Sequence, residues 1–236
     1  MNLSDNQRRL FWLIFSIILN SIANALTIAT SMGSAVWTAS AVNLSHWITH
    51  SSSPAVANQV LGPVLIWYGV IVAFITMLLN RKLDLGRFIK NLLFMIPFSY
   101  LVQWIVPFFT VTCHLNQLHA DVTHPFQLGL AIVLDIIGLF GIAVAISLYQ
   151  RANLILHPND DLSYIIRFKY LKGIASLSQW VSFIPPVVIT GMSYFANHQQ
   201  IWSFGFGTAW AFLTQGYLQG WSDKHIVPSF KHHFNL

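Results

Sequence analysis

The sequence predicts an all-α membrane protein with six transmembrane helices. Only 8% of its residues are charged and 55% are hydrophobic, whereas about a quarter of the residues in a soluble domain are charged. The apolar residues gather in six segments of about 20 residues, the length that crosses a bilayer core. All Lys and Arg residues fall on one side of these segments. Because the net charge of +5 reflects a scarcity of acids, we exclude soluble and nucleic-acid-binding proteins.

The six segments define the organisation of the chain. A cytoplasmic tail, 1–10, precedes a first half, 11–109, and an outer connection, 110–127, leads to a second half, 128–221, and a cytoplasmic tail, 222–236. The first segment has a long apolar region and others follow it, so we expect a helix of the mature protein and not a signal peptide. The segments are 11–31, 60–80, 88–109, 128–149, 173–195 and 201–221.

The positive residues orient the chain, since Lys and Arg in short loops stay on the cytoplasmic side of a membrane. The outer connections, 32–59, 110–127 and 196–200, contain none. The pattern predicts that both termini lie in the cytoplasm. With the N-terminus inside, the cytoplasmic side receives all twelve positive residues: Arg8, Arg9, Arg81, Lys82, Arg87, Lys90, Arg151, Arg167, Lys169, Lys172, Lys224 and Lys231.

The two halves resemble each other. Residues 36–38 (VWT) align with residues 158–160 (PND), and Gly86 aligns with Gly205 at the entry to the third helix of each half. Since three helices per half is an odd number, the second half must be inverted relative to the first. The sequence therefore predicts two inverted three-helix repeats, a construction found in many secondary transporters.

The aligned stretches also carry a family resemblance. The first half reads ATSMGSAVWTA and the second reads ISLYQRANLILHPNDDL. These stretches resemble the YczE/YyaS/YitT group of bacterial integral membrane proteins. The resemblance implies a multi-span protein of the bacterial plasma membrane, of the kind described as a permease or an accessory factor. The residues that carry it are Gly33 and Trp37 in the first half and Ala152, Asn153, Leu154, Pro158 and Asp160 in the second.

Asp135 is the only acid predicted to lie inside a segment. Lys90, at the end of the segment 88–109, is the only Lys or Arg within a segment, and an intramembrane carboxylate costs several kcal/mol unless it is protonated, hydrogen-bonded or facing water. We expect Asp135 either to contact a solute or take part in proton coupling, or to be a protonated Asp that is hydrogen-bonded across a helix interface. Its candidate partners are Asn20, Asn24, Gln103 and Gln215.

Two further features favour a site between the halves. Pro185 and its neighbour Pro186 remove backbone donors, so the fifth helix must kink or break, and in transporters such breaks often meet the substrate. Asn20 and Asn24 share a helix face. The alternative for these Asn residues is polar contact between helices.

The outer connection 110–127 gathers His114, His119, Asp121 and His124. Two interpretations are open: these side chains could bind a divalent metal or sense pH, or they could form a solvated polar loop. Their spacing fits no standard zinc signature, so we expect neither a metal nor a cofactor. We also expect no enzyme, because the chain has no Glu and no GxxxxGK[ST], HExxH or GxSxG motif.

The cytoplasmic stretch after residue 150 contains two adjacent acids that follow a Pro, which predicts a helix start. The sequence LSYIIRFKYLK that comes next predicts a short helix lying at the cytoplasmic interface. A sharper hypothesis is a cytoplasmic gate, formed by ion pairs from Asp160 or Asp161 to Arg167 or Lys169.

We expect a permease-like transporter of a small polar or sugar-like solute, bound between the halves. Trp67, Trp180 and Trp210 are candidates for stacking on a ring-shaped solute. The partners would be the lipid bilayer and the solute. Two alternatives stay open: an accessory or regulatory protein acting through a membrane-protein partner, and a substrate-binding subunit of a multi-component transporter. A transporter needs a polar cavity at its centre, whereas an accessory protein can have a dry, packed one.

Overall fold

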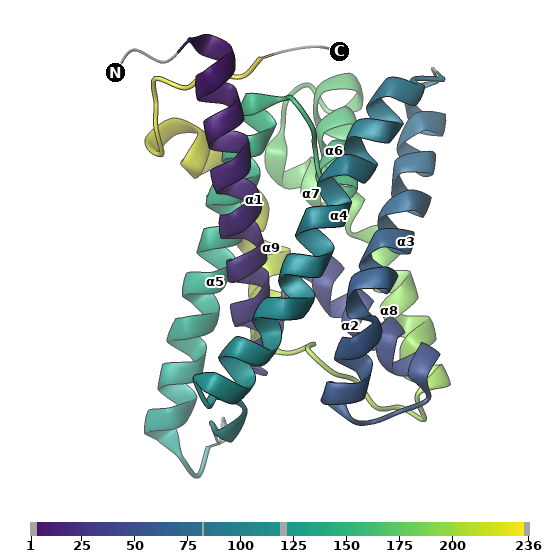
Figure 1. Ribbon diagram of the computed structural model, residues 1–236, viewed down its shortest axis with the longest axis vertical. Coiled ribbons are helices and arrows are strands. Elements are labelled where there is room, and N and C mark those ends of the chain that lie inside the picture. The colour runs from purple at the N-terminus through teal and green to yellow at the C-terminus, as the bar shows by residue number, and fades with distance from the viewer. Residues whose placement is uncertain (1–3, 82, 119–121, 234–236) are drawn as a thin grey trace.

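The computed structural model describes residues 4–81, 83–118 and 122–233, which form helices and contain no strand (Figure 1). The all-α prediction is confirmed for these residues. Short helical turns follow α4 (Phe108–Thr112 and Leu115–Gln117) and α6 (Ile166–Tyr170). The α-helices are α1 (Asp5–Ala29), α2 (Val36–Thr49), α3 (Pro54–Asn80), α4 (Leu85–Pro107), α5 (Pro125–Ala152), α6 (Pro158–Ile165), α7 (Ala175–Ser182), α8 (Ile184–Ala196) and α9 (Phe206–His225).

Four helical stretches are long and apolar enough to cross a membrane. They are Asp5–Ala29, Pro54–Asn80, Leu85–Thr112 and Pro125–Ala152, and they contain most of the first four predicted segments. Their number and composition identify a multi-pass membrane protein.

The last two predicted segments are not long apolar helices. Residues 173–195 are divided between α7 and α8, on either side of Phe183. The helix is interrupted there because Pro185 and Pro186 have no N–H group to continue its hydrogen-bond pattern. The predicted break is therefore confirmed. α9 has 20 residues, but polar residues such as Gln215 lower its hydropathy.

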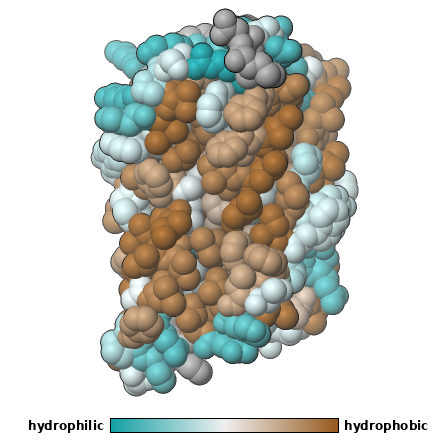
Figure 2. Space-filling view, turned by 60° about the vertical axis from the view of Figure 1, so that its left-hand side comes forward, coloured by the Kyte–Doolittle hydropathy of each residue, from teal (hydrophilic) through white to brown (hydrophobic). Residues whose placement is uncertain are grey.

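The side chains of α1 are arranged inside out relative to those of a soluble protein. Phe11, Ile18 and Ile22 are 40–53% exposed, whereas Asn20 and Asn24 are buried. Figure 2 shows the corresponding surface, on which an apolar band lies between two hydrophilic ends. Such a surface fits a lipid environment, where the polar side chains find their partners inside the bundle.

Two short helices lie in the long connections that follow α1 and α5. In Figure 1, α2 occupies the lower half of the bundle, and α6 occupies the upper half, near both chain ends. All eight residues of α6 are buried. This corrects the interfacial position predicted for residues 162–165, which lie inside the bundle, whereas Lys169 and Tyr170 of the following turn are exposed.

Local sequence explains where these two helices begin and end. α2 follows Gly33, whose φ of +117° is readily adopted only by glycine, and it ends at His50 in the left-handed conformation. α5 ends at Asn153, also left-handed, and Pro158 opens α6. Proline suits a first helical position because the N–H group it lacks would have no partner there.

The helices pack in matched pairs. α1 lies along α5; α1 contacts α4 as α5 contacts α9; and α3 contacts α4 as α7 contacts α9. α2 packs against α3 and α8, while α6 packs against α7 and α3. This packing brings the first turns of α2 and α6 toward each other in the middle of the bundle.

Candidate functional site

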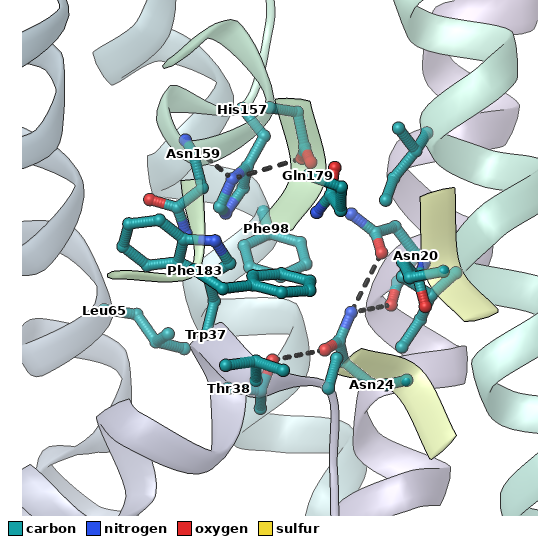
Figure 3. Close-up of a pocket in the computed structure, with 17 residues that line it drawn as sticks. Asn20, Asn24, Trp37, Thr38, Leu65, Phe98, His157, Asn159, Gln179 and Phe183 are labelled. Carbon is teal, nitrogen blue, oxygen red and sulfur yellow. Dashed lines mark hydrogen bonds and ion pairs between the residues drawn. The ribbon is translucent and has the colours of Figure 1, made fainter. Parts of the chain in front are cut away.

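The first residues of α2 and α6 meet at a cavity of about 50 Å³ (Figure 3). Its wall includes residues 35–38 at the start of α2 and His157, Asn159 and Asp160 at the start of α6. Side chains from α1, α3, α4, α5, α7 and α9 complete the wall. The cavity is thus built from both halves of the chain.

The cavity adjoins the amino-terminal ends of two helices. The first N–H groups of a helix have no partner within it, and the helix dipole adds partial positive charge there. Ala35 gives α2 no side-chain cap. At the start of α6, the backbone N–H of Asn159 donates to Nδ1 of His157 at 3.3 Å. The two weakly positive ends therefore face the same small space.

Three side chains in the cavity wall have polar atoms without a partner within the described parts of the chain. These atoms are Nε1 of Trp37, Oδ1 of Asn159, and both Oε1 and Nε2 of Gln215. The three residues are 8%, 8% and 2% exposed. Because buried polar groups are rarely left without a hydrogen bond, these atoms point to a polar molecule in the cavity.

The polar side chains of α1 join the wall through a short hydrogen-bond chain, visible in Figure 3. Nδ2 of Asn24 donates to the side-chain oxygen of Asn20 at 2.9 Å, and its own side-chain oxygen accepts a hydrogen bond from Thr38 of α2. These bonds fix the Asn24 amide and connect α1 to the first turn of α2.

The structure brings three of the six predicted site residues together. The three that line the cavity are Asn20, Asn24 and Gln215, whereas Gln103, Asp135 and Pro185 do not.

Asp135 lies behind the site and not in it. Its Oδ1 accepts a hydrogen bond from Thr30 at 2.9 Å, and it is fully buried. A Cβ atom added to Gly207 would collide with the Asp135 carboxylate and with the carbonyl oxygen of Gly33. Asp135 is therefore enclosed where the link between α1 and α2 crosses the start of α9, so the site prediction is corrected for this residue.

Gln103 and Pro185 also have other surroundings. The side-chain oxygen of Gln103 accepts from the backbone N–H of Gly62 at 2.8 Å, which ties α4 to α3. Pro185 lies in the first turn of α8, and it is the neighbouring Phe183 that reaches the cavity. The helix break contributes to the site indirectly.

The acids of α6 form contacts other than the predicted gate pairs. Asp161, fully buried, accepts hydrogen bonds from Arg87 Nε at 2.9 and 3.0 Å and from Asn91 Nδ2 at 2.8 Å. Asp160 accepts a hydrogen bond from Tyr149 and lies 3.5 Å from Nδ1 of His157. Because α6 turns into the bundle, its first turn faces α4 and α5.

Arg167 and Lys169, the basic residues predicted to pair with these acids, lie about two helical turns further along the chain. NH1 of Arg167 is 3.5 Å from the carboxylate of Asp223, and Nζ of Lys169 donates to the carbonyl oxygen of Asn80 at 2.6 Å. They connect the stretch after α6 to α9 and α3. Asp161 of α6 is therefore paired with Arg87, which corrects the predicted pairing.

The predicted metal cluster falls partly outside the described residues, since these do not include His119 and Asp121. His114 precedes a 3₁₀ turn, and His124 precedes α5. Within 4–81, 83–118 and 122–233, no three His, Cys, Asp or Glu side chains lie together as metal ligands would.

Aromatic side chains in the wall are ones that the sequence prediction missed. Trp37, Phe98 and Phe183 line the cavity. Trp67 is 69% exposed, and Trp180 stacks on Phe212, so the predicted stacking residues lie elsewhere. The repeat alignment was the signal for Trp37 and Asn159, because residues 36–38 and 158–160 are the first three residues of α2 and of α6.

Comparison with known proteins gives a family but no described relative. No curated protein and no solved structure matches the chain significantly. One protein family matches residues 7–224, which include all of α2 to α8 and nearly all of α1 and α9. The chain therefore belongs to that family, a family of unknown function named DUF6198.

Proposed function

We propose that this protein is a permease-like membrane transporter of a small polar solute, which binds in the cavity between the two halves. The observation that carries the proposal is the meeting of two half-length helices, α2 and α6, at a buried cavity with unpartnered polar atoms. Transporters often build their sites in this way, with the ends of interrupted helices near the bilayer midplane.

The proposal includes six spans, arranged as two inverted three-helix repeats with cytoplasmic termini. In this assignment α7 and α8 together form the fifth span and α9 the sixth. The matched packing supports the repeat: exchanging α1, α2, α3 and α4 for α5, α6, α7–α8 and α9 leaves the principal helix pairs unchanged. The one-sided distribution of Lys and Arg supports the orientation.

An approach to the cavity from the outside also supports transport. A chamber of about 600 Å³ lies beside α2 and the start of α3, on the side opposite the chain termini. Val42 and Leu61 line this chamber, and Thr38 and Leu65, one helical turn away on the same helices, line the cavity. A solute would enter the chamber first and then move along α2 to the cavity.

The Arg87–Asp161 pair would close the route on the cytoplasmic side. It joins the start of α4 to α6, and opening in that direction would require these charges to separate or move together. In an alternating-access cycle, the chamber would be the outer entry and the ion pair would be the cytoplasmic barrier.

The bacterial plasma membrane is the proposed location, and lipids are the surrounding partners. Both follow from the resemblance of the aligned loops to the YczE/YyaS/YitT group, which stays a prediction from the sequence. The unpartnered polar groups in the cavity wall favour a transporter over an accessory protein with a dry centre.

Solute flux into proteoliposomes tests the proposal. Stopped-flow light scattering would measure entry of a panel of small amides, polyols and amino acids. We expect flux of at least one class above that of empty liposomes, reduced by Asn159→Leu and unchanged by Asn6→Leu, an exposed residue in the first turn of α1. No flux of any solute through correctly folded protein would contradict transport and would favour the accessory function.

A further inference from the structure

The hydrogen-bonding groups of the cavity define the chemistry of its ligand. Trp37 Nε1 is a donor only, Oδ1 of Asn159 is an acceptor, and the Gln215 amide has a free donor and a free acceptor. A ligand that satisfies all of them must itself carry both N–H or O–H donors and an acceptor oxygen. An amide group has this combination within one plane.

The charges around the cavity exclude an ionic ligand. Among its lining residues there is no Lys or Arg, and the ionisable ones are Asp160 and His157. Asp160 is engaged by Tyr149 and lies beside His157, while the acid next to it, Asp161, is paired with Arg87. The starts of α2 and α6 supply only partial positive charge, and Asp160 is already engaged, so neither sign of full charge would be balanced by a free partner.

The volume limits the size of the ligand. One water needs about 10–15 Å³ of such space, so a cavity of about 50 Å³ holds roughly four non-hydrogen atoms. The rings of Trp37, Phe98 and Phe183 form part of its wall, and flat aromatic surfaces favour a planar molecule.

We infer that the cavity binds a small, neutral, planar amide of the urea or acetamide class. The Gln215 amide pairs with the ligand amide, Trp37 Nε1 donates to the ligand carbonyl oxygen, and Asn159 accepts from a ligand N–H group. This inference rests on the proposed function, since it names the solute for the same site.

A series of molecules of one shape tests the inference. Urea, guanidinium and nitrate are all planar, with three groups around a central atom, and they differ in charge. Uptake of each, labelled, into proteoliposomes would be compared with that by empty liposomes. We expect saturable uptake of urea, competition by excess acetamide, and uptake of neither ion. Gln215→Leu should lower urea uptake about tenfold, the effect of losing roughly 1.4 kcal/mol of binding, whereas Gln200→Leu, in an exposed loop, should not change it.

Each other outcome overturns the inference in a distinct way. Uptake of nitrate that depends on Gln215 would mean that the helix ends select an anion, and uptake of guanidinium would mean that Asp160 selects a cation. In both cases the proposed transport function would stand. Failure of urea uptake together with flux of a larger solute would reject the amide class alone. Absence of flux for every solute would reject both proposals.

Discussion

α2 and α6 have matching neighbours in the bundle, yet they are held by different forces. α6 is charged: Asp160 and Asp161 lie in its first turn, and Arg87 binds the second of them. α2 has no charged residue in its first turn. It is held by neutral groups, chiefly Asn43, whose side chain donates to the carbonyl oxygen of Trp202 at 2.6 Å and accepts from its N–H at 3.0 Å.

The difference matches the orientation proposed for the chain in the membrane. Because positive residues are retained on the cytoplasmic side, the proposal places an arginine there for α6, whereas the predicted outer connections lack Lys and Arg. A buried charge that loses its partner costs more than a neutral group that does. α6 should therefore be more sensitive than α2 to a single substitution.

We expect the largest loss of stability from Arg87→Met. It leaves the Asp161 carboxylate buried without its cation, and such losses cost about 3–5 kcal/mol. Thermal unfolding in detergent measures the change, with Lys90→Met, an exposed residue one turn away, as the control. If the two variants unfold at similar temperatures, charge does not hold α6 in place.

The next effect concerns the entry to α2. A Cβ at position 207 would collide with the carbonyl oxygen of Gly33, so Gly207→Ala should destabilise the protein by about 1–3 kcal/mol through overpacking. Gly191→Ala is the matched control, because a Cβ there meets no atom within 4 Å. The control should be neutral or slightly stabilising. Equal unfolding temperatures would show that the link and α9 are not in close contact.

Asn43→Leu should lower the free energy of unfolding by about 1–3 kcal/mol, as much as Gly207→Ala or less. It leaves the backbone groups of Trp202 unpaired but leaves no charge without a partner. Asn197→Leu removes a single 3.2 Å hydrogen bond to the Asn43 carbonyl oxygen and should cost less. Thermal unfolding of both variants beside Arg87→Met gives the comparison directly. If Asn43→Leu lowered the unfolding temperature more than Arg87→Met, α2 and not α6 would be the more sensitive of the two half-helices.

The smallest expected effect is a pH dependence of the unfolding temperature, caused by Asp223 near the C-terminal end of α9. Burial raises the pKa of Asp223, but hydrogen bonds with His232 and Ser147 and the charge of Arg167 outweigh it, so the pKa lies below its ordinary 3.8. Asp223 therefore stabilises the fold above that value, and this contribution is lost as the pH falls further. Between about pH 5 and about pH 3, the unfolding temperature of the wild type should fall more than that of Asp223→Asn. Parallel curves would argue against the Asp223 contacts.

Much of the fold could be predicted from hydropathy, and local sequence predicted the start of α6 at Pro158, but the burial of α2 and α6 inside the bundle could not be predicted. The four long apolar helices stand out because their lipid-facing side chains are uniformly apolar. α2 and α6 contain buried Ser, Thr, Asn and Asp residues that bond inside the bundle, and in a sequence such residues resemble an exposed loop. The alignment of residues 36–38 with 158–160 still marked both starts, since each must begin a helix at the same cavity.

The site was predictable to the extent that polar residues in an apolar helix indicate an interior face. Asn20, Asn24 and Gln215 were found in this way. The Arg87–Asp161 contact was not, because 74 positions separate the two residues and only the inward turn of α6 brings them together. Asp135 was misplaced because its depth in α5 does not reveal which neighbour encloses it.

The most direct test of the central cavity as a solute site is its chemical accessibility. In a Cys113→Ser background, Ala35→Cys places the chain's one thiol in the cavity wall, and Ala145→Cys places it in the fully buried core. We expect methyl methanethiosulfonate to modify the first variant in proteoliposomes, more slowly when a transported solute is present, and to leave the second unmodified. Equal protection of both thiols would contradict the account, because no solute could then reach the point where α2 and α6 meet.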